Sequence, residues 1–139
     1  MSDISIIAGP YAFRARFEDA LAPQTCAAFR RLLPYSERIL HVRWSGEACW
    51  IPLGTHDFGL GPEDPTSYPA PGQVILYPGG IPGSVSETEI LIAYGPCRFA
   101  SKAGQLAGNP LLTITEGLDQ LHALGRLTLE KGAQPIRFG

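Results

Sequence analysis

The residues best suited to chemistry lie in one stretch, residues 39–54, with the sequence ILHVRWSGEACWIPLG. It reads as two strands joined by a tight turn at Ser45-Gly46, with Arg43 and Trp44 before the turn and Trp50 after it. A guanidinium is a fixed planar donor for carboxylates and amides, and indole rings offer flat apolar contact. A hairpin with these side chains beside its turn can line a concave site, although tryptophan in a strand is more often a core residue.

Carboxylates elsewhere in the chain are candidate partners for Arg43. Residues 89–94 alternate as a strand, which places Glu89 and Leu91 on one face. Glu89 is interpreted either as an ion-pair partner that orders an empty pocket or as part of a ligand site, and Glu87 and Glu47 are further acidic candidates. Arg43 itself is either an ordinary surface residue of a strand or the main ligand-binding group.

Histidine and cysteine give little sign of a dedicated centre. His41 is interpreted as a hydrogen-bonded interior residue or, alternatively, as a general base, whereas His56 and His122 have no partner at ligand spacing. The sequence contains no HxH, HExxH or CxxC pattern, no GK[ST] phosphate loop and no GxSxG elbow. We therefore expect no metal site and no cofactor. The cysteines form no close pair and are interpreted as reduced, buried thiols: Cys26, Cys49 and Cys97.

Composition limits the class of protein. Charged residues make up 17% of the 139 residues, against roughly a quarter in an average protein. A net charge of −2 gives no electrostatic basis for binding nucleic acid or an anionic membrane. No stretch approaches the ~18 apolar residues of a membrane span, and the first residues do not resemble a signal peptide. We expect one cytoplasmic domain over residues 1–139.

Side-chain periodicity predicts seven short strands, at residues 11–18, 39–44, 47–51, 73–77, 89–94, 111–114 and 136–138. Helices are predicted over residues 23–33 and 116–131, where apolar side chains recur three and four residues apart. Loops are expected at residues 55–71 and 101–110, with a tight turn at residues 78–83. Strands that are grouped, and do not alternate with helices, indicate a closed, mainly antiparallel barrel with a helix over each open end.

Several segments, in order over residues 11–138, resemble cyclophilins. RARFEDALAPQTCAAFRRLLP is similar to their strand that enters a helix through Pro-x-Thr, and HVRWSG is similar to their Phe-His-Arg strand. PGQVILYPGG, SETEILIAYG and TITEGLDQLHALG resemble three later segments, and HVRWSGEACWIPLG, YPGG and RFASKAGQLAGN resemble more closely a bacterial cyclophilin-like family of undefined function. The resemblance implies a mainly β, cyclophilin-like barrel and places Arg43 on the catalytic arginine of prolyl isomerases.

The same resemblance shows where the chain departs from an isomerase. Leu91 stands where cyclophilins have the aromatic floor of the proline pocket, and Glu89 replaces their glutamine. Gln105 and Pro110 replace a tryptophan and a histidine of that site, and a proline beside Tyr77 replaces an asparagine. Tyr77 is expected either to cap the pocket with its hydroxyl or only to pack at the end of its strand.

Three functions remain open. The preferred one is a cyclophilin-like barrel whose reshaped pocket, on the outer face, binds or also turns over a small polar or anionic metabolite. The others are a prolyl isomerase of altered specificity and a homo-oligomeric scaffold with a vestigial pocket. The catalytic candidates are Arg43 and Glu89, and the ligand-binding candidates are Glu47, Trp50, Tyr77 and Leu91. The expected partner is a small molecule, with no nucleic acid and no membrane.

Overall fold

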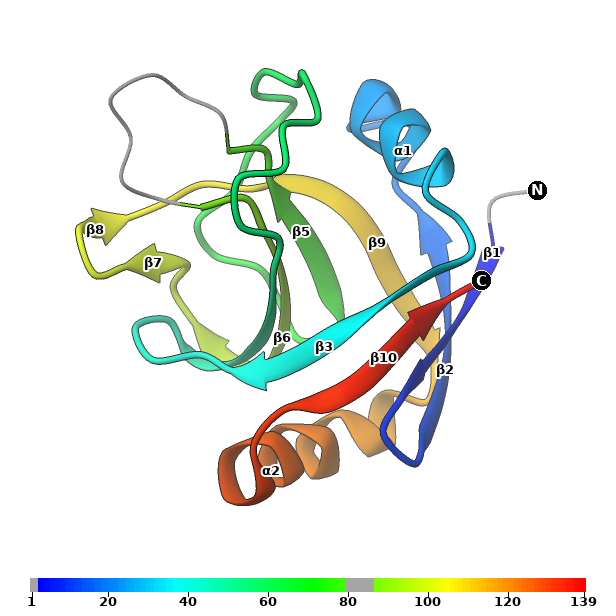
Figure 1. Cartoon of the computed structure of the whole chain (residues 1–139), viewed down its shortest axis with the longest axis vertical. Helices are drawn as coiled ribbons and strands as arrows, with labels where there is room; N and C mark the ends of the chain where they lie inside the picture. The colour runs from blue at the N-terminus through cyan, green and yellow to red at the C-terminus, as the bar shows by residue number, and fades with distance from the viewer. Residues whose placement is uncertain (1–2, 80–86) are drawn as a thin grey trace.

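The computed structural model describes residues 3–79 and 87–139 (Figure 1). The strands are β1 (Asp3–Ala8), β2 (Tyr11–Phe17), β3 (Tyr35–His41), β4 (Gly46–Pro52), β5 (Gln73–Tyr77), β6 (Glu89–Cys97), β7 (Ala100–Ser101), β8 (Gly104–Gln105), β9 (Asn109–Glu116) and β10 (Gln134–Phe138). The helices are α1 (Pro23–Arg30) and α2 (Leu121–Lys131), with a short 3₁₀ helix, η1 (Leu118–Gln120), before α2.

Eight of the described strands close into a barrel in the order β1-β10-β3-β4-β6-β5-β9-β2, and every neighbouring pair is antiparallel. The two remaining strands, β7 and β8, form a separate hairpin. In Figure 1 this hairpin lies beside the barrel, and α1 and α2 lie at opposite ends of it. The predicted mainly β, closed antiparallel barrel with two helices is confirmed.

The barrel interior holds the main hydrophobic core, which the two helices close. Side chains of β2 alternate as predicted, with Phe13, Ala15 and Phe17 buried between exposed residues. Phe29 of α1 packs edge-on against Phe138 of β10, with ring centroids 5.1 Å apart, and Leu124 of α2 belongs to the same core. Burial of such side chains contributes roughly 1.5–3 kcal/mol each, so this interior is the main source of stability.

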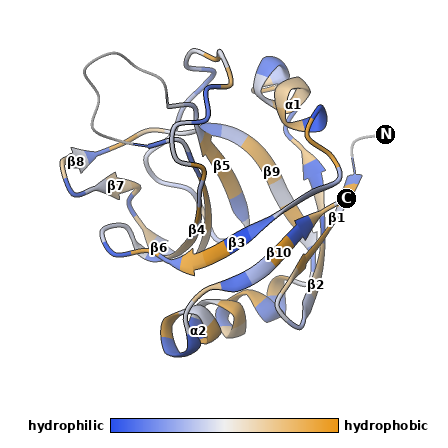
Figure 2. Cartoon of the chain, in the orientation of Figure 1, coloured by the Kyte–Doolittle hydropathy of each residue, from blue (hydrophilic) through white to orange (hydrophobic). Residues whose placement is uncertain are grey.

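A second, smaller hydrophobic cluster lies on the outer face of the barrel, and it matters for the site. We call it the outer cluster; its buried members are Ala48, Ile75, Tyr77, Leu91 and Phe99. β5 is hydrophobic along most of its length in Figure 2, because Val74 and Leu76 face the interior core while Ile75 faces the outer cluster. The outer face of β5 and β6 is therefore covered by the side chains of the outer cluster.

Several element boundaries differ from the prediction. β3 ends at His41, so residues 42–45 are not a strand, and α1 ends at Arg30, three residues early. The second helix begins at Leu121 and not at residue 116. Gly117 has a φ of 92°, which is not helical, and the 3₁₀ helix η1 lies between it and α2. β1 was not predicted, and the β7–β8 hairpin lies at a predicted loop. Residues 80–83 of the predicted turn at 78–83 lie outside the described residues.

The long loop between β4 and β5 is fixed to α1 by Glu63. The N-cap residue of α1, Ala22, makes no side-chain cap. Instead, the Glu63 carboxylate accepts hydrogen bonds from the backbone nitrogens of Gln24 (3.1 Å) and Thr25 (2.7 Å) and from the Thr25 hydroxyl (2.6 Å). The Asn109 side chain accepts from the Glu63 nitrogen and donates to Thr25 Oγ1. A distant carboxylate thus satisfies the first-turn donors that a cap residue normally satisfies.

None of the described helices is both long enough and apolar enough to cross a membrane.

Candidate functional site

The outer cluster supports a cavity of about 550 Å³. Its walls come from the segment between β3 and β4, from β4, from the start of β6 and from the β7–β8 hairpin. We call it the Arg43 cavity; the residues that line it are Val42, Arg43, Trp44, Ser45, Trp50, Glu87, Glu89, Ala100, Ser101, Lys102 and Ala103. Its volume lies within the range of about 300–1,000 Å³ that is typical of small-molecule sites.

Arg43 reaches the cavity because the chain leaves β3 just before it. The Val42 nitrogen still donates to the Ala48 carbonyl (3.1 Å), but beyond it residues 43–45 follow no strand geometry. Val42 and Arg43 therefore both line the cavity, and the predicted strict alternation, with Arg43 on the face of His41, is wrong. Trp44, next in the chain, is 54% exposed and lines the same cavity.

The β7–β8 hairpin, which carries Lys102, is held at the cavity by Ser45. The Ser45 hydroxyl donates to the Ala100 carbonyl (3.2 Å) and accepts from the Ala100 nitrogen (3.0 Å), and the Arg98 nitrogen donates to the Ser45 carbonyl (2.9 Å). Both hydroxyl contacts go to backbone, so Ser45 has a structural role here. It fixes the β7–β8 hairpin beside the Arg43 segment, with Lys102 at the hairpin turn.

Glu89 is a half-buried carboxyl group at the start of β6. Burial, with a smaller contribution from the neighbouring Glu87 carboxylate, raises the pKa of Glu89 to about 7. Among the described residues no ion pair joins Arg43 or Lys102 to Glu89, and neither cation has a hydrogen-bond partner. The interpretation of Glu89 as the ion-pair partner of Arg43 is therefore not what the structure shows.

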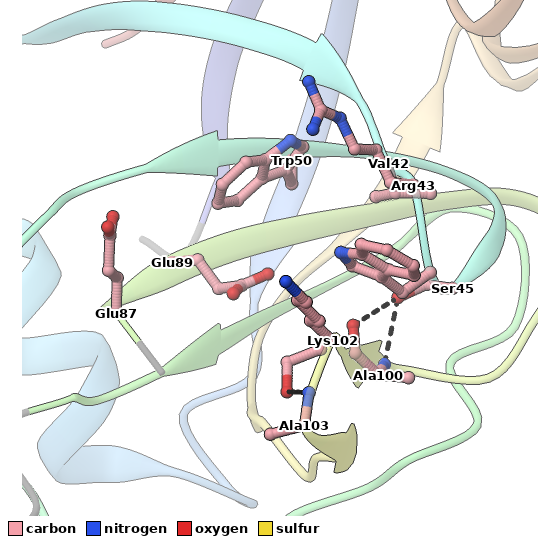
Figure 3. A pocket seen from close by; sticks show the side chains of 11 residues that line it. Val42, Arg43, Ser45, Trp50, Glu87, Glu89, Ala100, Lys102 and Ala103 are labelled. Carbon is pink, nitrogen blue, oxygen red and sulfur yellow. Dashed lines mark hydrogen bonds between the residues drawn. The ribbon is translucent and has the colours of Figure 1, made fainter. Parts of the chain in front are cut away.

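Figure 3 shows how these side chains are arranged. Glu89 and Lys102 extend into the hollow from opposite walls, whereas the Arg43 guanidinium lies at the rim next to Trp50. The cavity thus has two cationic groups at separate points, one acidic group and aromatic surface along one wall. Such a set can bind a planar anion at the rim and place a second polar atom near the acid.

The structure brings three of the six predicted site residues to this cavity: Arg43, Trp50 and Glu89. Leu91 is fully buried in the outer cluster, directly opposite Trp50 across the β4–β6 pair, so it supports the wall without lining it. Tyr77 is also buried there, with its ring 6.0 Å from that of Phe99. This is the packing role that was the alternative to a hydroxyl cap.

The remaining candidate, Glu47, does not line the Arg43 cavity. Its side chain lies against Gly95 of β6, where an added Cβ would come within 2.1 Å of Glu47 Oε1. The β4–β6 register shifts between Gly46 and Ala48, and this bulge changes the direction in which Glu47 points. Regular alternation could not predict that change.

The sequence did not single out the four lining residues that come from the β7–β8 hairpin: Ala100, Ser101, Lys102 and Ala103. Lys102 lies in a stretch that was expected to be a loop, 59 positions from Arg43 in the numbering. The only local signal is the Gly104 that permits a tight hairpin turn, with a φ of 131°. Nothing in that signal says which face of the barrel the hairpin covers.

The histidines do not line the Arg43 cavity. His41 bonds with the Val42 carbonyl oxygen (2.8 Å) and the Tyr94 hydroxyl (2.7 Å), which agrees with a hydrogen-bonded interior residue. His122 packs edge-on against the Tyr94 ring, and His56 against that of Phe58. Within the described residues no group of three or more His, Cys, Asp or Glu side chains is arranged to hold a metal ion.

The three cysteines are free, and two of them, Cys26 and Cys49, are buried. Cys97 is only half-buried, so the expectation that all three would be buried is wrong for this residue. Burial is the main cause that raises the pKa of each thiol, to about 11 for Cys49 and for Cys97. Thiols with raised pKa values are weak nucleophiles at neutral pH.

A second cavity, of about 310 Å³, lies over β5, β9 and the end of β2. Pro110, which the resemblance places on the histidine of the isomerase site, lines this cavity and not that of Arg43. The positions that resemble the proline pocket are therefore divided between two cavities and a buried cluster.

The comparisons agree with this architecture. The structure of McbB in complex with tryptophan has a TM-score of 0.74 and 16% identity, covering 97% of this chain and 43% of that chain. A cyclophilin-type peptidyl-prolyl cis-trans isomerase of Cryptosporidium parvum has a TM-score of 0.57 and 13% identity, covering 99% of this chain and 97% of that chain. The chain thus spans less than half of McbB. At these identities the likeness shows a cyclophilin-like fold and no more.

No protein with curated annotation matches the chain. One family model, described as a protein of unknown function (DUF3830), matches residues 4–139, which is nearly the whole sequence. The chain, a cyclophilin-like barrel, therefore belongs to the DUF3830 family, whose function is unknown.

Proposed function

We propose that the Arg43 cavity binds a small metabolite in which a carboxylate or similar planar anion is joined to a flat apolar group. The observation that carries the proposal is the state of its cations. Arg43 and Lys102 line a cavity of about 550 Å³ and have no anionic or hydrogen-bonding partner among the described residues. Both side chains are exposed, and a guanidinium beside an apolar wall favours a planar carboxylate, because it can donate two parallel hydrogen bonds.

The apolar part of the ligand is expected to contact Trp44 and Trp50. The exposed Trp44 ring is available for stacking, and the Val42 side chain extends the same apolar surface. Flat rings stack on indole with a gain of about 0.5–1.5 kcal/mol beyond the area that they bury. McbB, a relative in fold, has a structure in complex with tryptophan, and tryptophan combines a carboxylate with a flat ring. That likeness supports the proposal as an analogy of fold.

Glu89 explains how an anion is accepted close to a carboxyl group. With a pKa raised to about 7, a large fraction of Glu89 is protonated at neutral pH, and in that state it donates a hydrogen bond. A carboxylate of ordinary pKa in this position would repel the ligand. Below about pH 7 the site therefore offers the anion mainly two cations and one neutral donor, whereas above it Glu89 is mainly ionised.

Intrinsic fluorescence tests the proposal, because the chain has two tryptophans and both line the cavity. We expect 3-phenylpropionate to change the emission saturably and its neutral amide, 3-phenylpropionamide, to bind at least tenfold more weakly. Arg43→Lys should weaken binding of the carboxylate about tenfold or more, since lysine cannot form the bidentate contact.

Arg137→Lys is the matched control, because Arg137 is an exposed arginine on β10, away from the cavity. It should bind 3-phenylpropionate as the wild type does. Equal binding of the acid and the amide, or equal binding by the wild type and Arg43→Lys, would show that the cavity does not recognise an anion through Arg43.

A further inference from the structure

We propose that Glu89 is a general base that interconverts the keto and enol forms of small 2-oxo acids bound in the Arg43 cavity. The inference rests on the proposed function and goes one step beyond it, from binding to a reaction and a substrate class. A base for such a step has to be rigidly mounted, free of a competing partner and adjacent to bound substrate.

The backbone of Glu89 is fixed on both sides. It lies opposite Pro52 of β4 and opposite Tyr77 of β5 in the barrel. From this position its side chain lines the cavity and extends into the hollow, as Figure 3 shows. Catalytic groups mounted on strands are held more precisely than those on loops.

The surroundings of Glu89 set its basicity. The charged groups that share its cavity are Glu87 from the same part of the chain, Arg43 from the segment before β4 and Lys102 from the β7–β8 hairpin; Tyr77 is its titratable neighbour on β5. Burial and the Glu87 carboxylate raise the pKa of Glu89 to about 7. A carboxylate of that pKa is a stronger base than an ordinary glutamate and is still ionised to a useful extent at neutral pH.

The cations supply what the product of deprotonation needs. Removing a proton from the carbon next to a carbonyl group places negative charge on the carbonyl oxygen. Lys102 extends into the hollow as Glu89 does, so it is the donor suited to the enolate oxygen, whereas Arg43, at the rim, is the donor suited to the carboxylate (Figure 3). A 2-oxo acid presents these two oxygen groups on adjacent carbons, and its side chain is then directed to the tryptophan wall.

The step balances without a co-reactant. The Glu89 carboxylate takes a proton from C3 of the 2-oxo acid, and the electron pair of the broken C–H bond forms the C2–C3 double bond. The π electrons of the C2 carbonyl move onto its oxygen. Glu89 then delivers the proton either to that oxygen, giving the enol, or back to C3. Nothing is oxidised or reduced, and the base is regenerated.

Phenylpyruvate is a suitable probe, because it joins a carboxylate and a carbonyl group to an aromatic ring through an acidic CH₂. Exchange of its C3 protons for deuterium in D₂O, measured by NMR, reports proton transfer, and tryptophan fluorescence measures binding in the same samples. We expect exchange well above the protein-free rate in the wild type and a loss of at least about 100-fold in Glu89→Gln, in line with the usual size of general-base catalysis. Glu130→Gln, on the exposed surface of α2, is the matched carboxyl-to-amide control and should exchange normally.

The pH profile gives a readout that a merely structural role of Glu89 would not produce. Exchange per bound substrate should rise with pH through about 7 in the wild type, because the base must be ionised. In Glu87→Gln the midpoint should move to lower pH, because the neighbouring charge that helps to raise the Glu89 pKa is gone. A midpoint unchanged by Glu87→Gln, or exchange by Glu89→Gln at the wild-type rate, would overturn the inference.

The experiment also separates this inference from the proposed function. If phenylpyruvate quenches tryptophan fluorescence in an Arg43-dependent manner but exchanges its C3 protons only at the protein-free rate, the catalytic role of Glu89 is refuted. The proposed binding function is then still supported. Phenylpyruvate that neither binds nor exchanges refutes both.

Discussion

The Nε2 atom of His41 lies 2.7 Å from the hydroxyl oxygen of Tyr94. The other ring nitrogen of His41, Nδ1, lies 2.8 Å from the Val42 carbonyl oxygen. A carbonyl only accepts hydrogen bonds, so Nδ1 carries a hydrogen and, in the neutral ring, Nε2 accepts from Tyr94. This pair fixes the last residue of β3, from which the chain departs into the segment that carries Arg43.

Tyr94→Phe tests the contribution of this hydrogen bond. The ring is kept, which matters because it packs so closely against Gly125 of α2 that a Cβ there would lie 2.4 Å from it. The loss of the hydroxyl leaves His41 Nε2 without its donor, so we expect the free energy of unfolding in urea to fall by about 0.5–1.5 kcal/mol. Tyr68→Phe is the control, since Tyr68 is 65% exposed and should change stability by less than about 0.5 kcal/mol. Equal effects of the two substitutions would contradict the interpretation.

Much of the barrel could be predicted because its strands have one interior face. β5 was predicted with its observed bounds, and Ile90 and Ile92 of β6 face the interior core opposite Leu91, as alternation requires. β1 was missed because its pattern is less clear. Ile7, on the face opposite Ile6, is 46% exposed, so apolar residues occupy both faces of that strand.

The site could be predicted only in part, because periodicity identifies a face but not what covers it. Alternation placed Glu89 and Leu91 on the same outer face, yet Glu89 lines the cavity and Leu91 is buried two residues further along. The difference arises from Phe99 and Trp50, which pack over that part of the sheet. Lys102 depends on the contact between Ser45 and Ala100, which are 55 residues apart, and no local pattern encodes such a contact.

Glu63 should contribute to stability through α1. Glu63→Ala removes the acceptor of three first-turn donors, and we expect a loss of about 1–2 kcal/mol in the free energy of unfolding, as for a lost N-cap. Although burial opposes the change, the hydrogen bonds from Thr25 and Gln24 lower the pKa of Glu63 below its usual 4.5. Its contribution is therefore present above pH 4.5 and is lost as the pH falls through the lowered value.

Chemical denaturation of the wild type and Glu63→Ala at pH 7 and at acidic pH checks this expectation. Glu116→Ala is the control, because the exposed Glu116 makes only a 3.9 Å ion pair with Arg14. If Glu63→Ala costs no more than this control at pH 7, the capping role is wrong.

Glu89 should make stability depend on pH in the opposite direction. Its pKa is about 7 in the folded protein and near 4.5 in the unfolded chain, so between these values the folded protein binds more protons. The favourable contribution of the protonated group is present below pH 4.5 and is lost as the pH rises through about 7. Relative to Glu89→Gln, the wild type should lose up to about 3 kcal/mol between pH 4.5 and pH 8, at ~1.4 kcal/mol per pKa unit.

Urea unfolding of both proteins at several pH values measures this difference directly. Glu87→Gln should reduce the dependence, because the Glu87 carboxylate contributes to the raised pKa. A difference between wild type and Glu89→Gln that stays constant from pH 4.5 to pH 8 would mean that Glu89 has an ordinary pKa in the folded protein.

Prolyl isomerase activity should be at or near background, in spite of the cyclophilin-like fold. Isomerisation needs an apolar slot for the proline ring beside a guanidinium. Here Leu91, at the position that resembles the floor of the slot, is fully buried, and Pro110 lines a different cavity from Arg43. Arg43 thus lacks the slot that would place a prolyl imide nitrogen next to it, and the side chain beside its guanidinium is that of Trp50 (Figure 3). A protease-free assay with proline-containing model peptides measures the rate. A wild-type rate well above background that Arg43→Ala abolishes would show that a proline slot exists. Prolyl isomerisation would then be the preferred function.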